Sequence, residues 1–291
     1  MRIEKVCVVG LGSMGSQISV VFARAGLTTL ITEIDEEQLD LGFTRINSFL
    51  EKQLQRKKIN LKDKEAILAK LVPRVGVSAG AGEADFVVEA VFEDMSLKKQ
   101  VFAELDQVCG PNVILATNTS TLSITEIAAA TKKPGRCIGT HFLIPAALTS
   151  LVEVIRGHVT TDETVAITRE FLARCAKDIV VVADSPAFVI NRLYLPLINE
   201  AFFALSEGIA SAEEIDKSCQ SGLGMPLGPL AAADASGLDI ILACMNTLHR
   251  EFGDKYLPAP FLVKLVRAGF LGRKTNKGVY EYPTAHDGRD K

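Results

Sequence analysis

The chain has 291 residues, of which 48% are hydrophobic and 23% are charged, and its formal net charge is -3 at pH 7. This is the composition of a folded globular protein with one large or two modest cores, and it excludes a disordered chain, a collagen-like rod and a disulfide scaffold. The small acidic excess argues against a basic surface for nucleic acid.

Short β-branched runs alternate with amphipathic stretches through roughly the first 185 residues. The predicted strands are Lys5–Val9, Thr28–Thr32, Arg74–Ser78, Asp85–Ala90, Val113–Ala116, Cys137–Phe142, Leu151–Ile155 and Asp178–Ala183. The predicted helices between them are Met14–Ala25, Glu36–Lys57, Met95–Val108, Ile124–Ala129 and Glu163–Ala176. Apolar strands joined by crossover helices predict a doubly wound, mostly parallel sheet, and the short links between the last strands predict a mixed edge.

The strand pattern stops after Asp184-Ser185-Pro186. The predicted helices beyond it are Phe188–Ser206, Ala212–Gln220, Leu227–Ala233, Leu238–Phe252 and Phe261–Ala268. We therefore expect an α/β domain over residues 1–185 and a smaller all-α domain over residues 186–291. The longest apolar run, 188–205, contains several polar residues, so we expect a buried helix kinked at Pro196 rather than a membrane span.

The six cysteines lie far apart and form no CxxC pair. This spacing favours reduced thiols in a cytosol-like compartment and gives no reason to expect a bound metal. A strand-like run begins near Lys5, which leaves no room for a signal peptide before it. The sequence therefore predicts a cytoplasmic protein that does not enter the membrane.

The first predicted strand leads into a glycine-rich turn that opens a helix. The residues of this turn are Gly10, Leu11, Gly12, Ser13, Met14 and Gly15. The first glycine would allow the tight turn, the second would let the backbone approach a pyrophosphate, and the third would let helix and strand pack closely. The diphosphate would lie at the helix N-terminus. The pattern alone also fits an ordinary turn, but the strand before it and the helix after it favour a dinucleotide site.

Glu33 closes the second predicted strand, at roughly the 20-residue spacing at which an acidic residue takes the adenosine ribose hydroxyls. A carboxylate there would repel a 2′-phosphate, so we expect NAD rather than NADP. The alternative is that Glu33 and Asp35 only cap the next helix, and we expect Asp35 to do so.

Further polar residues follow the later predicted strands, where ligands bind in an open parallel sheet. They are Glu93, Lys98, Asn118, Ser120 and His141. A histidine at a strand end often only packs or caps, but Glu153 lies among apolar neighbours in the next strand, where a carboxylate needs a partner. If these two strands are neighbours, Glu153 would orient His141 and form a His–Glu base.

Several distinctive segments occur in order along the chain. They are VVGLGSMG, VVEAVFEDMSLKKQVFAELD, ILATNTSTLSITEIA, HF followed by LVEVIRG, DSPAFVINRLYLPLINEA and GRKTNKGVYEY. Over nearly its whole length the chain thereby resembles the short-chain L-3-hydroxyacyl-CoA dehydrogenases, which include bacterial 3-hydroxybutyryl-CoA dehydrogenases. The resemblance implies a Rossmann-type NAD-binding domain, a helical domain that forms a homodimer, and NAD-dependent interconversion of a 3-hydroxyacyl-CoA and its 3-oxoacyl form in fatty acid metabolism.

The resemblance also implies individual roles. His141 would be the catalytic base oriented by Glu153, Ser120 would hydrogen-bond the reacting oxygen, and Asn191 would fix the substrate from the helical domain. The residues lining the nicotinamide half of the site would be Glu93, Lys98 and Asn118. Read without the resemblance, Asn118 and Ser120 fit an ordinary loop turn equally well, and Asn191 fits a helix cap or bridge.

The chain departs from the family where the substrate pocket is expected. Ile144 stands where the family usually has asparagine and Ser150 where it often has lysine, and Met225 and small alanines replace aromatic and bulky residues. Exchange of a hydrogen-bonding group for a hydrocarbon can shift substrate choice strongly, so we expect an unusual acyl group. The thioester carrier could be coenzyme A or acyl-carrier protein, and the basic run Arg56–Lys58 either meets its phosphates or is a solvated helix end.

Two other functions fit parts of the sequence. An NAD-binding protein with little turnover, like a lens crystallin, would have no physical need to keep Ser120, His141, Glu153 and Asn191 together. A free β-hydroxy-acid dehydrogenase of the hydroxyisobutyrate type would use a GxxxK arrangement, which is missing from Gly222–Leu230.

Overall fold

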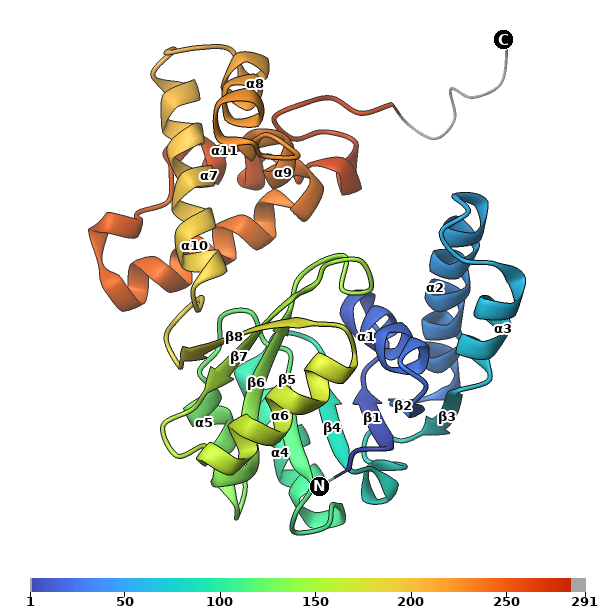
Figure 1. Ribbon diagram of the computed structural model, residues 1–291. Coiled ribbons are helices and arrows are strands. Elements are labelled where there is room, and N and C mark those ends of the chain that lie inside the picture. Colours follow the sequence, from blue (N-terminus) through green and yellow to red (C-terminus); the bar gives the residue numbers. More distant parts are fainter. Residues whose placement is uncertain (1, 284–291) are drawn as a thin grey trace. The chain divides into compact units, whose positions relative to one another are not determined.

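The computed structural model describes residues 2–283 and divides into two compact units, the first ending at Phe188 and the second beginning at Val189 (Figure 1). Each unit is considered by itself below. Within the described residues, no helix combines the length and the apolar character that crossing a bilayer would require.

The first unit is built on a sheet of eight strands in the order β3-β2-β1-β4-β5-β6-β7-β8. The strands are β1 Lys5–Val9, β2 Thr28–Glu33, β3 Leu71–Val75, β4 Phe86–Glu89, β5 Ile114–Thr117, β6 Cys137–Phe142, β7 Leu151–Arg156 and β8 Asp178–Ala183. All neighbours are parallel except β6 and β7, which run antiparallel. The 3-2-1-4-5-6 order of the first six strands is that of a Rossmann-type fold. The predicted doubly wound sheet with a mixed edge is therefore confirmed.

Helices cover both faces of this sheet (Figure 1). They are α1 Ser13–Arg24, α2 Glu36–Gln55, α3 Leu61–Leu68, α4 Met95–Val108, α5 Ile124–Ala128 and α6 Asp162–Arg174, with 3-10 turns η1 Ala81–Glu83 and η2 Pro134–Arg136. Alternate strand residues point to opposite faces, so Val6 and Val8 pack in the core formed with α1 and α6, while Cys7 and Val9 pack in the core formed with α4 and α5. Burial on both faces explains why these strands are continuously apolar.

The structure differs from the sequence prediction at two elements of this unit. The third strand covers Leu71–Val75, whereas the sequence predicted Arg74–Ser78. Pro73 lies inside the observed strand, and a proline normally argues against a strand. A proline lacks a donor, but β3 is an edge strand that pairs only with β2, where this loss is tolerated. Helix α3 was not predicted. It is short and begins with a capping box between Asn60 and Asp63, and Ile67 is its only fully buried residue, so its apolar periodicity is weak.

The second unit is helical, as predicted. Its elements are α7 Ile190–Ser206, α8 Ala212–Leu223, α9 Pro229–Ser236, α10 Leu238–Phe252, η3 Asp254–Tyr256, α11 Pro260–Arg267 and η4 Arg273–Thr275. The long apolar run forms α7 and includes Pro196. Two buried aspartates fasten the closing segment. Asp216 accepts a hydrogen bond from the Tyr280 hydroxyl at 2.8 Å, and Asp234 accepts one from the Tyr282 hydroxyl at 3.0 Å.

Candidate active site

The glycine-rich turn has the geometry that a bound dinucleotide needs. Gly10 has a φ of +89°, and a Cβ on Gly15 would lie 1.7 Å from the Gly10 carbonyl oxygen, so the protein's own packing requires both glycines. A Cβ on Gly12 would meet nothing within 4 Å. Gly12 is the N-cap residue of α1 and leaves the helix N-terminus, at Ser13 and Met14, without a capping side chain. The open approach to this helix end fits a pyrophosphate.

Two acidic residues, Glu33 at the end of β2 and Asp35 before α2, have different partners. The Glu33 carboxylate is half-buried and accepts a hydrogen bond from the Leu11 N–H at 2.6 Å, which ties the end of β2 to the glycine-rich turn. Asp35 caps α2 by accepting from the Gln38 N–H at 2.8 Å, as expected. Glu33 therefore lies beside the turn that would hold the diphosphate, which is the place a ribose-binding carboxylate requires.

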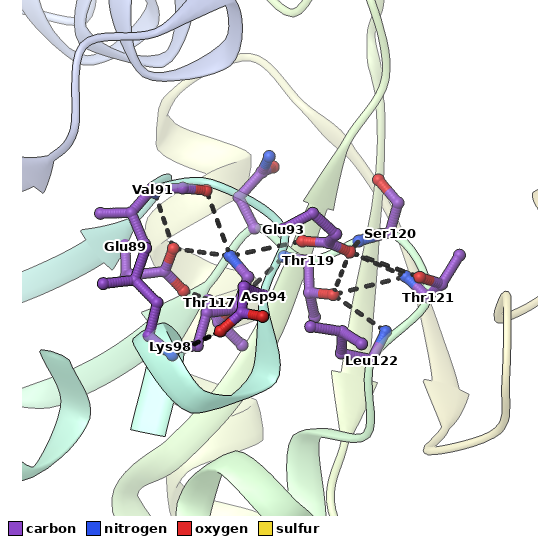
Figure 2. Close-up of polar contacts among 12 residues, drawn as sticks. Glu89, Val91, Glu93, Asp94, Lys98, Thr117, Thr119, Ser120, Thr121 and Leu122 are labelled. Carbon is purple, nitrogen blue, oxygen red and sulfur yellow. Dashed lines mark hydrogen bonds and ion pairs between the residues drawn. The ribbon is translucent and has the colours of Figure 1, made fainter. Parts of the chain in front are cut away.

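Glu93, Lys98 and Ser120 come together at the ends of β4 and β5 (Figure 2). The Glu93 carboxylate accepts from the Ser120 N–H at 2.8 Å and lies 3.4 Å from the ammonium of Lys98. Lys98 is 1% exposed, and its shortest ionic contact, at 2.6 Å, is with Glu89. Glu89 was missed in the sequence, although the carboxylate ends an otherwise apolar strand and so carries the same signal that identified Glu153.

Asn118 joins the end of β5 to the end of β6. Its side-chain oxygen accepts a hydrogen bond from the Phe142 N–H at 3.0 Å, one residue beyond His141. The backbone N–H of Asn118 in turn donates to the Glu89 carbonyl at 2.8 Å. Asn118 therefore connects the loop that carries Ser120 to the strand that carries His141.

His141 and Glu153 form a buried pair. They are direct partners in the antiparallel register of β6 and β7, and the His141 Nδ1 lies 2.8 Å from the Glu153 Oε2. Their exposed fractions are 3% and 1%, and the Phe188 ring packs against the imidazole at 5.5 Å between centroids. With Nδ1–H donating to the carboxylate, a neutral imidazole keeps Nε2 as its acceptor. This arrangement can accept a proton at Nε2 and stabilise the resulting imidazolium.

Three further predicted positions are Asn191, Ile144 and Ser150. Asn191 is in the first turn of α7, in the second unit. Ile144 is 70% exposed in the loop that follows β6, and Ser150, immediately before β7, is exposed as well. Within residues 2–283, no three histidine, cysteine or acidic side chains gather in a way that could hold a metal ion.

Comparison with protein families assigns both halves of the chain. The 3-hydroxyacyl-CoA dehydrogenase NAD binding domain matches residues 5–185, and the 3-hydroxyacyl-CoA dehydrogenase C-terminal domain matches residues 188–282. The chain belongs to the 3-hydroxyacyl-CoA dehydrogenase family. It is thus an NAD-dependent 3-hydroxyacyl-CoA dehydrogenase, which confirms the predicted family, enzyme class and cofactor.

Individual dehydrogenases match over nearly the full length. The 3-hydroxybutyryl-CoA dehydrogenase of Bradyrhizobium diazoefficiens is 42% identical over 281 residues, covering 96% of each chain. The probable 3-hydroxybutyryl-CoA dehydrogenase of Bacillus subtilis is 43% identical over 286 residues, covering 97% of this chain and 98% of that one. The crystal structure of (S)-3-hydroxybutyryl-CoA dehydrogenase from Ralstonia eutropha has a TM-score of 0.92 at 40% identity, covering 97% of this chain and 100% of that one.

Proposed function

We propose that the dehydrogenase interconverts an L-3-hydroxyacyl thioester and its 3-oxoacyl form, with His141 as the acid–base residue and Glu153 as its partner. The observation that carries the proposal is the buried 2.8 Å contact between the His141 Nδ1 and the Glu153 carboxylate. A general base needs a fixed tautomer and a partner that stabilises its charged form, and Glu153 supplies both.

In the proposed reaction, the His141 Nε2 removes the proton of the 3-hydroxyl, and in the reverse direction it returns that proton to the forming alkoxide. The chemistry that NAD supplies when bound is the acceptance of a hydride from C3. The Glu153 carboxylate balances the imidazolium. Ser120 and Asn191 donate hydrogen bonds to the substrate oxygen, where negative charge develops. The Gly10–Gly15 turn binds the diphosphate and Glu33 binds the adenosine ribose. The residues that line the nicotinamide half of the cofactor site are Glu93, Lys98 and Asn118.

Substitution of His141 tests this assignment. We expect His141→Asn to lower kcat for 3-hydroxyacyl-CoA oxidation, followed by NADH absorbance, by about 10²–10⁴-fold. His158→Asn is a matched control, because His158 is exposed in the turn after β7. Hydride transfer at the wild-type rate in a single turnover of His141→Asn would remove His141 from the mechanism. A wild-type protein that binds NAD but turns over no 3-hydroxyacyl thioester would support the alternative of a crystallin-like protein.

The acyl group is proposed to differ from hydroxybutyryl. Ile144 places an exposed hydrocarbon in the loop after His141, where the family usually has an amide. We expect Ile144→Asn to raise the kcat/KM ratio of 3-hydroxybutyryl-CoA to other 3-hydroxyacyl-CoA thioesters. If the wild-type protein already prefers 3-hydroxybutyryl-CoA over every other thioester in the panel, this part of the proposal is wrong.

The carrier of the acyl group is proposed to be coenzyme A, with acyl-carrier protein as the alternative. Arg56, Lys57 and Lys58 are exposed where α2 ends, so they can meet the phosphates of either carrier. We expect Arg56→Gln with Lys58→Gln to raise KM for the CoA thioester and to leave KM for a phosphate-free N-acetylcysteamine thioester unchanged. Comparing CoA and carrier-protein thioesters on the wild type then separates the two carriers.

A cytoplasmic homodimer formed through the helical domain is also proposed. The cysteines of the described residues are all free thiols, which suits a reducing compartment. Leu223 and Ile209 in the helical domain are 66% and 70% exposed, and a second copy of the chain would remove such apolar side chains from water. Sedimentation of the full chain as a monomer would contradict the homodimer.

A further inference from the structure

Two residues outside the proposed reaction, Glu89 and Thr117, lie side by side on β4 and β5, the two central strands of the sheet. They are the last residues of β4 and β5 and are register partners in the parallel pair. Both are fully buried, and the Thr117 hydroxyl donates to the Glu89 Oε2 at 2.7 Å. The other oxygen of Glu89 accepts from the Lys98 ammonium at 2.6 Å and from the Val91 N–H at 2.7 Å.

These contacts belong to a closed ring of side-chain contacts that one backbone N–H completes (Figure 2). From Glu89 the ring passes through Lys98 to the Glu93 Oε2 at 3.4 Å. The other oxygen of Glu93 accepts from the Thr119 hydroxyl at 2.6 Å. The ring closes where the Thr119 N–H donates to the Thr117 hydroxyl oxygen at 3.3 Å.

The ring determines where the backbone of the Ser120 loop lies. Glu93 accepts from the N–H groups of Ser120 and Thr121 at 2.8 and 3.3 Å, and the Thr119 hydroxyl accepts from the Leu122 N–H at 3.0 Å. Four consecutive residues of this loop, 119–122, are thus bonded to members of the ring. Any shift of Glu93 therefore moves Ser120.

Stability alone gives little reason to keep such a ring. A buried ion pair is costly to desolvate, and well-packed apolar residues of similar volume often serve stability as well or better. Fixing one geometry is what a fully satisfied buried polar network does well. A displacement of about 1 Å at a reacting centre can cost about 10²-fold in rate, so the position of the Ser120 loop matters to the reaction.

We propose that Glu89 and Thr117 are positioning residues of the dehydrogenase, which hold Ser120 in place through Lys98 and Glu93. This inference rests on the proposed function, because it takes Ser120 as a hydrogen-bond donor to the reacting oxygen. The ring holds the Ser120 loop from one side, and Asn118 connects the same loop to Phe142, next to His141. Glu89 acts on the loop through Lys98 and Glu93, and Thr117 also acts directly, because its hydroxyl oxygen accepts from the Thr119 N–H.

Thr117→Val removes the hydroxyl at nearly constant volume, and Thr117→Ser is its matched control because it keeps the hydroxyl. We expect Thr117→Val to lower kcat by about tenfold to a hundredfold, with a much smaller change in KM for NAD, and Thr117→Ser to stay within about threefold of wild type. Thr119→Ala opens the same ring at another contact, so it supplies the comparison if Thr117→Val does not fold.

A double-mutant cycle with Ser120→Ala separates positioning from general loosening of the fold. If Thr117 acts through Ser120, the variant with Thr117→Val and Ser120→Ala loses no more kcat than Ser120→Ala alone. Two losses that multiply, or a Thr117→Val enzyme with wild-type kcat, would overturn the inference while Ser120→Ala remains impaired. A wild-type protein without dehydrogenase activity, or an unimpaired Ser120→Ala enzyme, would instead count against the proposed function on which the inference depends.

Discussion

Two buried carboxylates in this protein have different kinds of partner. Glu89 faces the ammonium of Lys98 at 2.6 Å, and Glu153 faces the imidazole of His141 at 2.8 Å. The Glu89 side chain has hydrogen-bond partners on both oxygens, so the Glu89 pair is suited to holding a fixed geometry. An imidazole can gain and lose a proton near neutral pH, so the Glu153 pair is suited to a site where charge changes during turnover.

The proposed role of Glu153 makes a prediction for Glu153→Gln. The amide keeps the shape of the side chain but loses the charge that balances an imidazolium, and its NH₂ group can donate to Nδ1 and select the other tautomer. We expect kcat to fall by about 10²–10⁴-fold, as acid–base catalysis is lost. Glu163→Gln, an exposed change near the start of α6, is the control and leaves kcat unchanged. A Glu153→Gln enzyme within a factor of two of wild type would contradict the pairing.

Contacts between residues on neighbouring strands could be predicted from the sequence. Contacts that depend on the course of a loop could not. Glu153 stood out because it lies among apolar neighbours, and the register of β6 and β7 confirms its contact with His141. The contact between Asn118 and the Phe142 N–H depends on how β5 leaves the sheet, which no local pattern encodes. Lys98 was expected at the cofactor, but its ion pair with Glu89 could be inferred only by knowing that α4 returns over β4.

At the scale of the elements, the glycines in the turn between β1 and α1 fall into two kinds. Some are required by the packing of the protein itself, and one is not. Gly15 faces the Gly10 carbonyl at a distance that admits no Cβ, whereas a Cβ on Gly12 would have open space around it. The three glycines of the motif therefore have different reasons to be glycine. We propose that the reason for Gly12 is the close approach of a pyrophosphate, because nothing in the protein itself crowds this position.

Two alanine substitutions test this division. We expect Gly15→Ala to lower the free energy of unfolding by about 3 kcal/mol or more, because backbone atoms must shift. Gly12→Ala should cost about 1 kcal/mol or less, the scale of a change at an N-cap position. It should nevertheless weaken NAD binding, measured by calorimetry, by about tenfold or more, equivalent to about 1.4 kcal/mol. NAD affinity at the wild-type level in Gly12→Ala would show that the diphosphate does not approach this residue.

For the molecule as a whole, ionisation of buried thiols links stability to pH. Cys7, Cys109, Cys137 and Cys175 are buried in the first unit. Burial, with a smaller contribution from the neighbouring Cys109, raises the pKa of Cys7 to about 12, and burial raises the pKa of Cys175 to about 12 as well. Burial is also the main reason that the pKa values of Cys109 and Cys137 are raised to about 11. Lys177 has the opposite effect on how stability changes with pH, because burial and the nearby Arg24 lower its pKa.

We therefore expect the first unit to lose stability as the pH rises above the ordinary thiol pKa of about 9. A thiol whose pKa is higher in the folded chain than in the unfolded chain stabilises the fold fully at pH values below the unfolded-state pKa. This stabilisation is lost as the pH rises from the unfolded-state pKa toward the folded-state pKa. Each such thiol contributes a loss of about 1.4 kcal/mol per pH unit in that window. Urea denaturation at about pH 8 and about pH 10 measures the loss, and in Cys7→Ala the slope should be shallower by about one proton. An unchanged slope in Cys7→Ala would show that this thiol ionises as readily in the folded chain as in the unfolded one.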